Sequence, residues 1–379
     1  MNRFIQKRTL LPVDHGVNHG FAVPQSELPV GQDGRMVDRS TAVSIRDVAE
    51  RAGVALGTVS NVLNRPQKVA ESTRKRVLDA IDELGFVRND AARQLRAGLS
   101  RTLGLIVLDV ANPFFTDVSR GVEDRAAEEG LSVLLGNSDE SESRESAHLD
   151  LFEQQRVRGL LISPLGDVSA RLGRLRRRGT PIVLVDRQAG DNPYSSVWVD
   201  DVAGGRMAVE HLLQTGRKRI AFVGGPASIR QVADRLAGAE QAVAGSGASL
   251  EIIETDGLIV ETGRKVGHDI IARAPKDRPD AVFAANDIVA IGLMQSLALL
   301  DHRLVPEEIA MIGYDDIDFA AASVIPLSSI RQPSELIGRT AVELMLRELD
   351  TIESGAEVDH EQVVFQPELV VRASTAPRG

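Results

Sequence analysis

The stretch Ser44-Ile-Arg-Asp-Val-Ala-Glu-Arg-Ala-Gly-Val-Ala-Leu-Gly-Thr-Val-Ser-Asn-Val-Leu-Asn64 decides the fold predicted for the first organised part of the chain. Ser44 is a good N-cap, and Asp47 three residues later completes a capping box for a helix over Ile45–Arg51. Gly53 then permits a tight turn into a second helix over Ala55–Leu63. Two short helices joined by a glycine-containing turn indicate a helix-turn-helix.

A third helix is predicted over Ser72–Leu84, because its apolar residues recur at helical spacing and Gly85 follows as a C-terminal cap. The first two helices can share one small core, formed by Ile45, Val48, Ala49, Val54, Val59, Val62 and Leu63. We therefore expect an all-α domain over residues 42–88. Residues 1–41 lack sustained periodicity and the apolar core of a signal peptide, so we expect a disordered extension that does not direct export.

A short segment with helix propensity, Asp90–Arg96, follows the possible N-cap Asn89. Seven residues are too few for a stable isolated helix. Gly98 and Ser100 then mark a linker. Residues 89–101 are accordingly predicted to be a conditional helix and a linker.

From Arg101 onward, short apolar runs alternate with amphipathic helices. This alternation predicts parallel sheets covered by helices on both faces, and the number of strands favours two doubly wound lobes. The predicted strands are Leu103–Leu108, Ser132–Leu135, Gly159–Ile162, Pro181–Val185, Arg219–Val223, Leu250–Ile253, Ala281–Ala284 and Ile309–Ile312.

Charge is distributed unevenly along the 379 residues, which together carry a net charge of −10. Residues 42–100 hold ten Lys and Arg against seven Asp and Glu, whereas residues 101–379 carry −14. A basic head on an acidic body suits a protein that contacts phosphate at one end only, although charge can also vary between domains by chance. No apolar run is long enough for a membrane helix, and the absence of cysteine excludes disulfides and thiolate metal sites.

Polar side chains follow several predicted strands, where ligands of doubly wound folds bind. They are Asp109, Asp186, Asn286 and Asp315, with Arg235 on a following helix and the aromatic residues Phe114 and Trp198 nearby. Carboxylate, amide and guanidinium groups can hydrogen-bond many hydroxyls, and aromatic rings can cover apolar ring faces. This chemistry favours a sugar or a similar polyhydroxylated ligand. Asp109 and Asp186 could instead be helix caps, and Phe114 and Trp198 could be core residues.

Over residues 43–372, several motifs resemble the lactose-repressor/purine-repressor (LacI) family. They are the Ser44–Asn64 motif, the turn Val69-Ala-Glu-Ser-Thr-Arg74, the segment Ala92-Arg-Gln-Leu95, and the later motifs Ala284-Ala-Asn-Asp287 and Gly313-Tyr-Asp-Asp316. The resemblance implies two lobes of periplasmic-binding-protein type. The N-lobe would span residues 102–200 and 332–357, the C-lobe residues 201–331 and 358–372, and a tail residues 373–379. It also implies a homodimer that binds a near-palindromic operator, with the second helix in the major groove.

The resemblance identifies the helix and linker of residues 89–101 as a hinge helix with its linker. It places DNA contacts on the head and this hinge, at Ser44, Leu56, Gly57, Thr58, Ser60, Asn61, Asn64, Asn89, Ala92, Arg93 and Leu95. Leu56 and Gly57 depart from the polar base readers of better-known members, so readout should depend more on Asn61 and the hinge. Ala55 likewise replaces the usual polar N-cap, at a cost of about 1 kcal/mol. The pair of Leu95 side chains would wedge into the minor groove and kink the DNA.

By matching position, the resemblance assigns effector contacts to Asp109, Phe114, Asp186, Trp198, Arg235, Asn286 and Asp315. Leu258 stands where some members carry an aromatic ring, which puts the preferred sugar in doubt. The effector could be a sugar acting as inducer, or a purine or other metabolite acting as corepressor. We expect a cytoplasmic repressor of carbohydrate-related genes without cofactor or metal.

The sequence lacks the features expected of two other classes of protein. An exported solute-binding protein would need a signal peptide and no helix-turn-helix. An enzyme on the same lobes should show a glycine-rich phosphate loop, a nucleophile elbow or a supported Ser/His/Asp arrangement, and the sequence contains none of these motifs. The histidines lack metal-ligand spacing. The sequence therefore favours a regulator over both alternatives.

Overall fold

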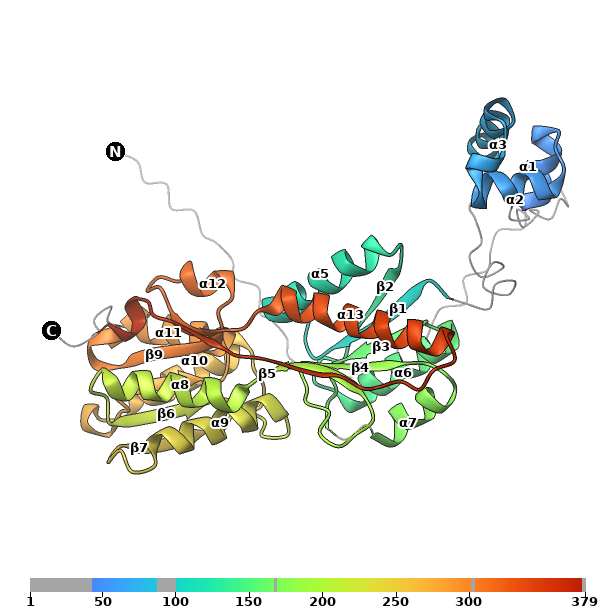
Figure 1. Ribbon diagram of the computed structural model, residues 1–379. Helices are drawn as coiled ribbons and strands as arrows, with labels where there is room; N and C mark the ends of the chain where they lie inside the picture. Colours follow the sequence, from blue (N-terminus) through green and yellow to red (C-terminus); the bar gives the residue numbers. More distant parts are fainter. Residues whose placement is uncertain (1–42, 87–99, 167–168, 301–303, 377–379) are drawn as a thin grey trace, which may run out of the picture. The chain divides into compact units, whose positions relative to one another are not determined.

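The computed structural model describes residues 43–86, 100–166, 169–300 and 304–376 (Figure 1). The chain divides into two compact units, Met1–Asp90 and Ala91–Gly379, which are described separately. The predicted extension over residues 1–41 and the hinge residues Asn89, Ala92, Arg93 and Leu95 lie outside the described residues.

The first unit contains the three predicted helices, α1 (Ile45–Ala52), α2 (Leu56–Asn64) and α3 (Glu71–Leu84), with a 3-10 turn at Pro66–Lys68. The capping box is confirmed, since the Ser44 backbone N–H donates to the Asp47 carboxylate at 2.7 Å. Gly53 and Gly85 end α1 and α3 with φ of +62° and +61°, the left-handed region that favours glycine. As expected from Ala55, α2 begins without a side-chain cap.

One small apolar core holds the three helices together. Val48, Val59 and Val77 come from different helices and are fully buried. The rest of the predicted core packs around them, completely or partly buried. Helical periodicity therefore predicted this domain correctly.

The N-lobe of the second unit is built on a parallel six-stranded sheet in the order β11-β5-β4-β3-β1-β2. Its strands are β1 (Thr102–Val107), β2 (Ser132–Asn137), β3 (Gly159–Ile162), β4 (Ile182–Val185), β5 (Ser195–Val199) and β11 (Gln362–Phe365). Helices α5 (Pro113–Glu128) and α13 (Ser334–Glu353) cover one face of the sheet. Helices α6 (Glu142–Gln155) and α7 (Ser169–Arg177) cover the other.

The C-lobe repeats this plan in the order β12-β10-β9-β8-β6-β7, with β12 antiparallel to β10. Its strands are β6 (Arg219–Val223), β7 (Ser249–Ile253), β8 (Ala281–Ala284), β9 (Ala310–Asp315), β10 (Ser328–Arg331) and β12 (Glu368–Val370). Helices α8 (Asp201–Gln214) and α9 (Arg230–Val243) pack on Ile220 and Phe222 of β6. Helices α10 (Val260–Ala272) and α11 (Asp287–Leu300) pack on Ala221 and Val223. Alternate residues of β6 therefore contact helices on opposite faces of the sheet.

The C-lobe also contains the short helix α12 (Asp318–Ala321), a 3-10 turn at Pro275–Asp277 and a π-helical turn at Leu304–Glu308. The fold class is confirmed, and each of the eight predicted strands is present within three residues of its predicted limits. No helix in the described ranges is long and apolar enough to cross a membrane.

The structure corrects two predicted boundaries near the C-terminus. Residues 358–372 were assigned to the C-lobe, but β11 within that range pairs with β5 of the N-lobe, and the chain reaches the C-lobe only at β12. Residues 373–379 were predicted to be a tail, but Ala373–Thr375 forms a 3-10 turn whose Ser374 and Thr375 are buried in the C-lobe. Short polar edge segments carry too weak a pattern to reveal such pairing.

Helices α5 and α13 approach closely through two glycines. A Cβ on Gly338 would lie 2.1 Å from the Val118 carbonyl oxygen, and one on Gly121 would lie 2.1 Å from the Glu335 carbonyl oxygen. Both neighbours are backbone atoms that a side-chain rotation cannot move. The absence of a side chain therefore sets the distance between these helices.

We predict that Gly338→Ala lowers the free energy of unfolding by about 1–3 kcal/mol, because the helices must separate. Gly173→Ala in α7 is the matched control, since its nearest neighbour is the flexible Arg177 guanidinium at 3.4 Å. That change should be neutral or stabilise by about 0.5–1 kcal/mol. Urea unfolding measures both, and equal effects of the two variants would contradict the packing argument.

Candidate functional site

The first candidate site is the outer face of α2. Leu56, Gly57, Asn61 and Asn64 are exposed there, while Val59 and Val62 on the opposite face are buried. Thr58 and Ser60 are half-buried. The Asn64 amide donates to the Ser60 carbonyl oxygen at 2.8 Å, and Ser44 lies at the start of α1. The predicted head residues on α2 thus have accessible side chains, apart from Gly57, which has none.

The second candidate site is a cavity between the two lobes, at the carboxyl ends of their strands. Its volume is about 30 Å³, room for little more than a water molecule. Its lining residues are Leu108, Asp109, Asn112, Phe114, Phe115, Glu140, Asp186, Ile229, Gln231, Val232, Arg235, Leu258, Asn286 and Asp315. The lobes are thus closed on each other, and a larger molecule would enter only if they separate.

Six of the seven effector residues predicted from the sequence line this cavity: Asp109, Phe114, Asp186, Arg235, Asn286 and Asp315. The exception is Trp198, which is half-buried on β5 and lines an adjacent pocket of about 270 Å³. Asp186 and Gln231 line both spaces. The prediction therefore grouped residues that the fold brings together, with one displaced to the neighbouring pocket.

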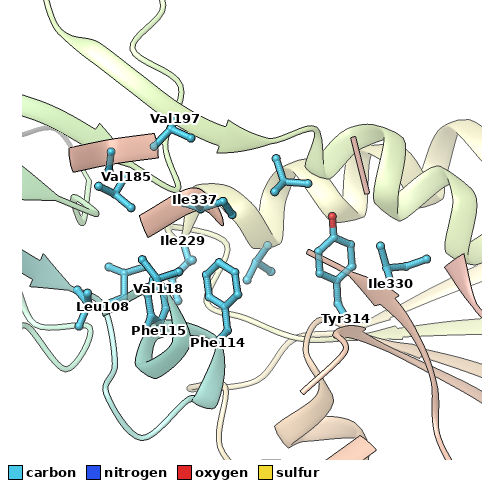
Figure 2. Close-up of a cluster of buried hydrophobic side chains, with 14 of the residues drawn as sticks. Leu108, Phe114, Phe115, Val118, Val185, Val197, Ile229, Tyr314, Ile330 and Ile337 are labelled. Carbon is cyan, nitrogen blue, oxygen red and sulfur yellow. The ribbon is translucent and has the colours of Figure 1, made fainter. Parts of the chain in front are cut away.

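Phe114 marks the contact between the lobes. Figure 2 shows its ring between Leu108 and Phe115 on one side and Tyr314 of the C-lobe on the other. Phe114 and Phe115 meet edge to face, with ring centroids 5.0 Å apart. Phe114 is thus both a core residue and part of the cavity wall, so the two readings of the sequence are compatible.

Arg235 forms the main polar cluster of the site. Its Nε donates to the Asp201 carboxylate at 2.8 Å, and its Nη1 donates to the Ala285 carbonyl oxygen at 2.7 Å. Nη1 also lies 3.8 Å from the Asp315 carboxylate. The guanidinium stacks on the Tyr314 ring at 3.7 Å from its centroid. A buried cation is thereby compensated on several sides, as burial requires.

The side-chain amides of Asn112 and Gln231 donate hydrogen bonds from one lobe to the other at the cavity. The Asn112 amide of the N-lobe donates to Asp315 at 3.1 Å. The Gln231 amide of the C-lobe donates to the Asp186 carboxylate at 2.8 Å. Sequence reasoning missed Asn112, Gln231 and Asp201. Of these three residues, only Asn112 could have been found from the sequence, because it stands just before Pro113 in the loop that follows a predicted strand.

Asp186 is buried, and its Oδ1 atom has no hydrogen-bond partner. Its backbone has φ of +55°, a conformation that Asp tolerates better than most residues. An unsatisfied buried carboxyl oxygen is costly unless it gains a partner or a proton. Asp186 is therefore the group in this cavity that most needs a ligand or a proton.

Burial changes the proton affinity of the cavity carboxyls. It raises the pKa of Asp186 to about 8, assisted by the charge of Asp201. It raises the pKa of Asp315 to about 6, against the opposing charge of Arg235. It also raises the pKa of Glu140 to about 7, with a smaller contribution from Asp109. The cavity therefore disfavours additional negative charge.

Asn286 and Asp109 have local structural roles as well. The Asn286 side chain accepts from the Val289 backbone N–H at 2.9 Å and so caps the start of α11. Asp109 accepts from the Ala111 backbone N–H at 2.9 Å. These hydrogen bonds orient both side chains while they line the cavity, but the N-cap of α5 is Asn112 and not Asp109. Within the described parts of the chain, no group of three His, Cys, Asp or Glu residues could hold a metal ion.

A model of bacterial regulatory proteins of the lacI family matches residues 44–89, and a periplasmic binding protein-like domain matches residues 209–375. The HTH-type transcriptional repressor PurR of Aliivibrio fischeri (strain MJ11) is 34% identical over 342 residues, which cover 88% of this chain and 99% of that protein. The ribose operon repressor of Bacillus subtilis (strain 168) is 34% identical over 304 residues, covering 80% and 90%. The lac repressor dimer bound to operator and the anti-inducer ONPF has a TM-score of 0.74 at 28% identity, covering 88% of this chain and 99% of that one.

A helix-turn-helix head joined to a two-lobed domain of this type defines a DNA-binding transcriptional repressor. The chain belongs to the LacI family of bacterial regulatory proteins.

The raised pKa of Asp186 predicts how stability changes with pH. The pKa is about 8 in the folded protein and about 3.9 in an unfolded chain, so the folded state holds the extra proton between these values. Stability from this group therefore falls as pH rises through that window, by up to about 1.4 kcal/mol per pH unit. Asp186→Asn should flatten this dependence in thermal melts recorded from pH 5 to about pH 8. The exposed loop variant Asp191→Asn should keep the wild-type slope, and an unchanged slope in Asp186→Asn would refute the assignment.

Proposed function

We propose that the protein is an operator-binding homodimer whose affinity for DNA is controlled by a small polar effector bound between its lobes. The observation that carries this proposal is the pairing, in one chain, of an exposed α2 face with a polar interlobe cavity. A cavity of this kind suits a sugar, in line with the ribose operon named for one relative. A purine or another metabolite, acting through the same site, is the alternative.

The cavity supports a mechanism of linked equilibria. The bonds Asn112–Asp315 and Gln231–Asp186 join the lobes directly, so a ligand inserted there must replace them or separate the lobes. A molecule that binds one lobe arrangement more tightly shifts the population toward it. Coupling of about 1–3 kcal/mol would change operator affinity by about 5–150-fold. The site residues assigned above would carry this coupling.

The DNA contacts follow from the α2 face and the hinge. Asn61 is the accessible side chain best suited to base readout, because an amide can pair with both edge groups of adenine. Leu56 offers only an apolar contact and Gly57 none, so Leu95 and the bent operator would supply the remaining specificity. Because its DNA target lies in the cytoplasm, we infer that the protein acts there and that its role is regulation rather than catalysis.

An apolar groove supports the homodimer. It has a volume of about 1120 Å³ and is lined mainly by α10, α11 and the segment around α12. Phe319 is 62% exposed and Val324 80% exposed on its wall. Contiguous exposed apolar surface of this kind marks an interaction site. A second copy is the occupant we propose, since the similar lac repressor was determined as a dimer.

Selection of bacterial genomic fragments with the full-length protein tests the operator assignment. We predict enrichment of near-palindromic sites, and for Asn61→Ala a loss of about 10–100-fold in affinity for them, the value of about 1–3 kcal/mol expected for a bidentate base contact. Affinity for unrelated DNA serves as the internal control and should change little. Absence of any enriched sequence would exclude the proposed function.

Val324→Glu should weaken the dimer, because it introduces a charge into the proposed interface without disturbing the packed interior. Val371→Glu is the matched control, since Val371 is 57% exposed and does not line the groove. Sedimentation velocity over a concentration series measures the association. Dimers of equal strength in both variants would place the interface elsewhere.

A further inference from the structure

Acidic side chains outnumber basic ones in the interlobe cavity. Four carboxyl groups line it, from Asp109, Glu140, Asp186 and Asp315, whereas Arg235 is the one basic side chain among the described lining residues. Asp201 lies directly behind Arg235 and adds a further carboxylate. A ligand entering this space therefore meets more negative than positive charge.

Two of the three guanidinium nitrogens of Arg235 already make hydrogen bonds. Its Nε is occupied by Asp201, its Nη1 by the Ala285 carbonyl oxygen, and one face of its guanidinium by Tyr314. Binding a phosphate or carboxylate through Nε or through this Nη1 contact would require Arg235 to give up partners that offset its burial. The cation serves to neutralise the carboxylates around it.

The backbone amides that usually bind anions are also largely occupied. At the start of α5, the Asn112 side chain accepts from the Phe114 N–H at 3.0 Å. At the start of α11, Asn286 accepts from the Val289 N–H. The start of α9 is uncapped, but Asp186 and Gln231 lie beside it at the cavity. An anion held by α9 would therefore lie close to a carboxyl group.

The unpartnered Oδ1 of Asp186 indicates what the cavity requires instead. A hydroxyl group can both donate and accept a hydrogen bond, so it suits this oxygen whether or not the carboxyl carries a proton. An ionised phosphate oxygen can only accept. Together with Asp315 and Asn286, Asp186 presents directed partners for hydroxyl groups.

We propose that this cavity selects uncharged, hydroxyl-rich molecules and rejects phosphorylated or carboxylated ones, and that Asp109 and Glu140 supply the charge that sets this preference. The inference rests on the proposed function, because it concerns the effector of the same site. The raised pKa of Glu140 agrees with it, since burial and neighbouring carboxylates also penalise an incoming anion.

The test uses full-length protein and matched pairs of compounds that differ by one phosphate: pentoses and hexoses with their monophosphates, and nucleosides with theirs. Thermal shift identifies the pairs that bind, and isothermal titration then gives the affinities. We expect the neutral member of a pair to bind and its phosphate to bind at least about tenfold more weakly, as like charges brought together in a buried site require.

Variants then identify the residues responsible. Glu140→Gln and Asp109→Asn should each narrow the difference in affinity between the neutral compound and its phosphate at least about threefold, since each removes an acidic group from the lining. Asp191→Asn is the matched control, because Asp191 is exposed and does not line the cavity. It should leave the difference unchanged.

The outcomes distinguish failure of the charge preference from failure of the proposed effector binding. A phosphorylated compound that binds as tightly as its neutral partner would overturn the charge preference and leave a small-molecule sensor intact. The charge preference would also be overturned if Glu140→Gln and Asp109→Asn variants fold normally but keep the wild-type difference in affinity between the neutral compound and its phosphate. If no member of any pair binds, the proposed effector class itself fails, and the further inference fails with it.

Discussion

The C-lobe side of the interlobe cavity is organised by one buried cation, the Arg235 guanidinium. It is 4% exposed and held between Asp201, the Ala285 carbonyl oxygen, Tyr314 and Asp315. These partners come from α8 and from the ends of β8 and β9, so the arginine fixes three elements of the C-lobe against one another. Removing one partner of such a buried pair typically costs about 3–5 kcal/mol. The charge of Arg235 also offsets the carboxylates of Asp201 and Asp315 that are buried beside it.

Around this cation, the two lobes meet through few direct polar bonds. Asn112 bonds Asp315, and Gln231 bonds Asp186, while Phe114 and Tyr314 supply apolar contact. The interior of either lobe differs from this junction, because it is formed by apolar residues such as Phe152 and Phe222 that are fully buried. Rigid lobes with a polar junction would suit the proposed effector-controlled equilibrium.

The head is a separate unit with its own small core. Seven buried residues, led by Val48, Val59 and Val77, hold three short helices together. A core of this size gives limited stability, which makes the local devices important: the Ser44–Asp47 capping box and the left-handed glycines at both helix ends. Leu56, Gly57 and Asn61, the proposed DNA contacts, lie exposed on the outer face of α2 and take no part in this core.

The sequence by itself determined the helix-turn-helix, the alternation of strands and helices, and six residues of the interlobe cavity. Helical spacing, capping residues and apolar runs are local signals, and ligands in doubly wound folds lie at predictable strand ends. Tertiary structure alone decided the rest. The pairing of β11 with the N-lobe, the burial of Ser374 and Thr375, and the displacement of Trp198 to a second pocket depend on contacts between distant segments. The partners of Arg235 and Asp186 likewise come from elements far apart in the chain, so no local pattern could specify them.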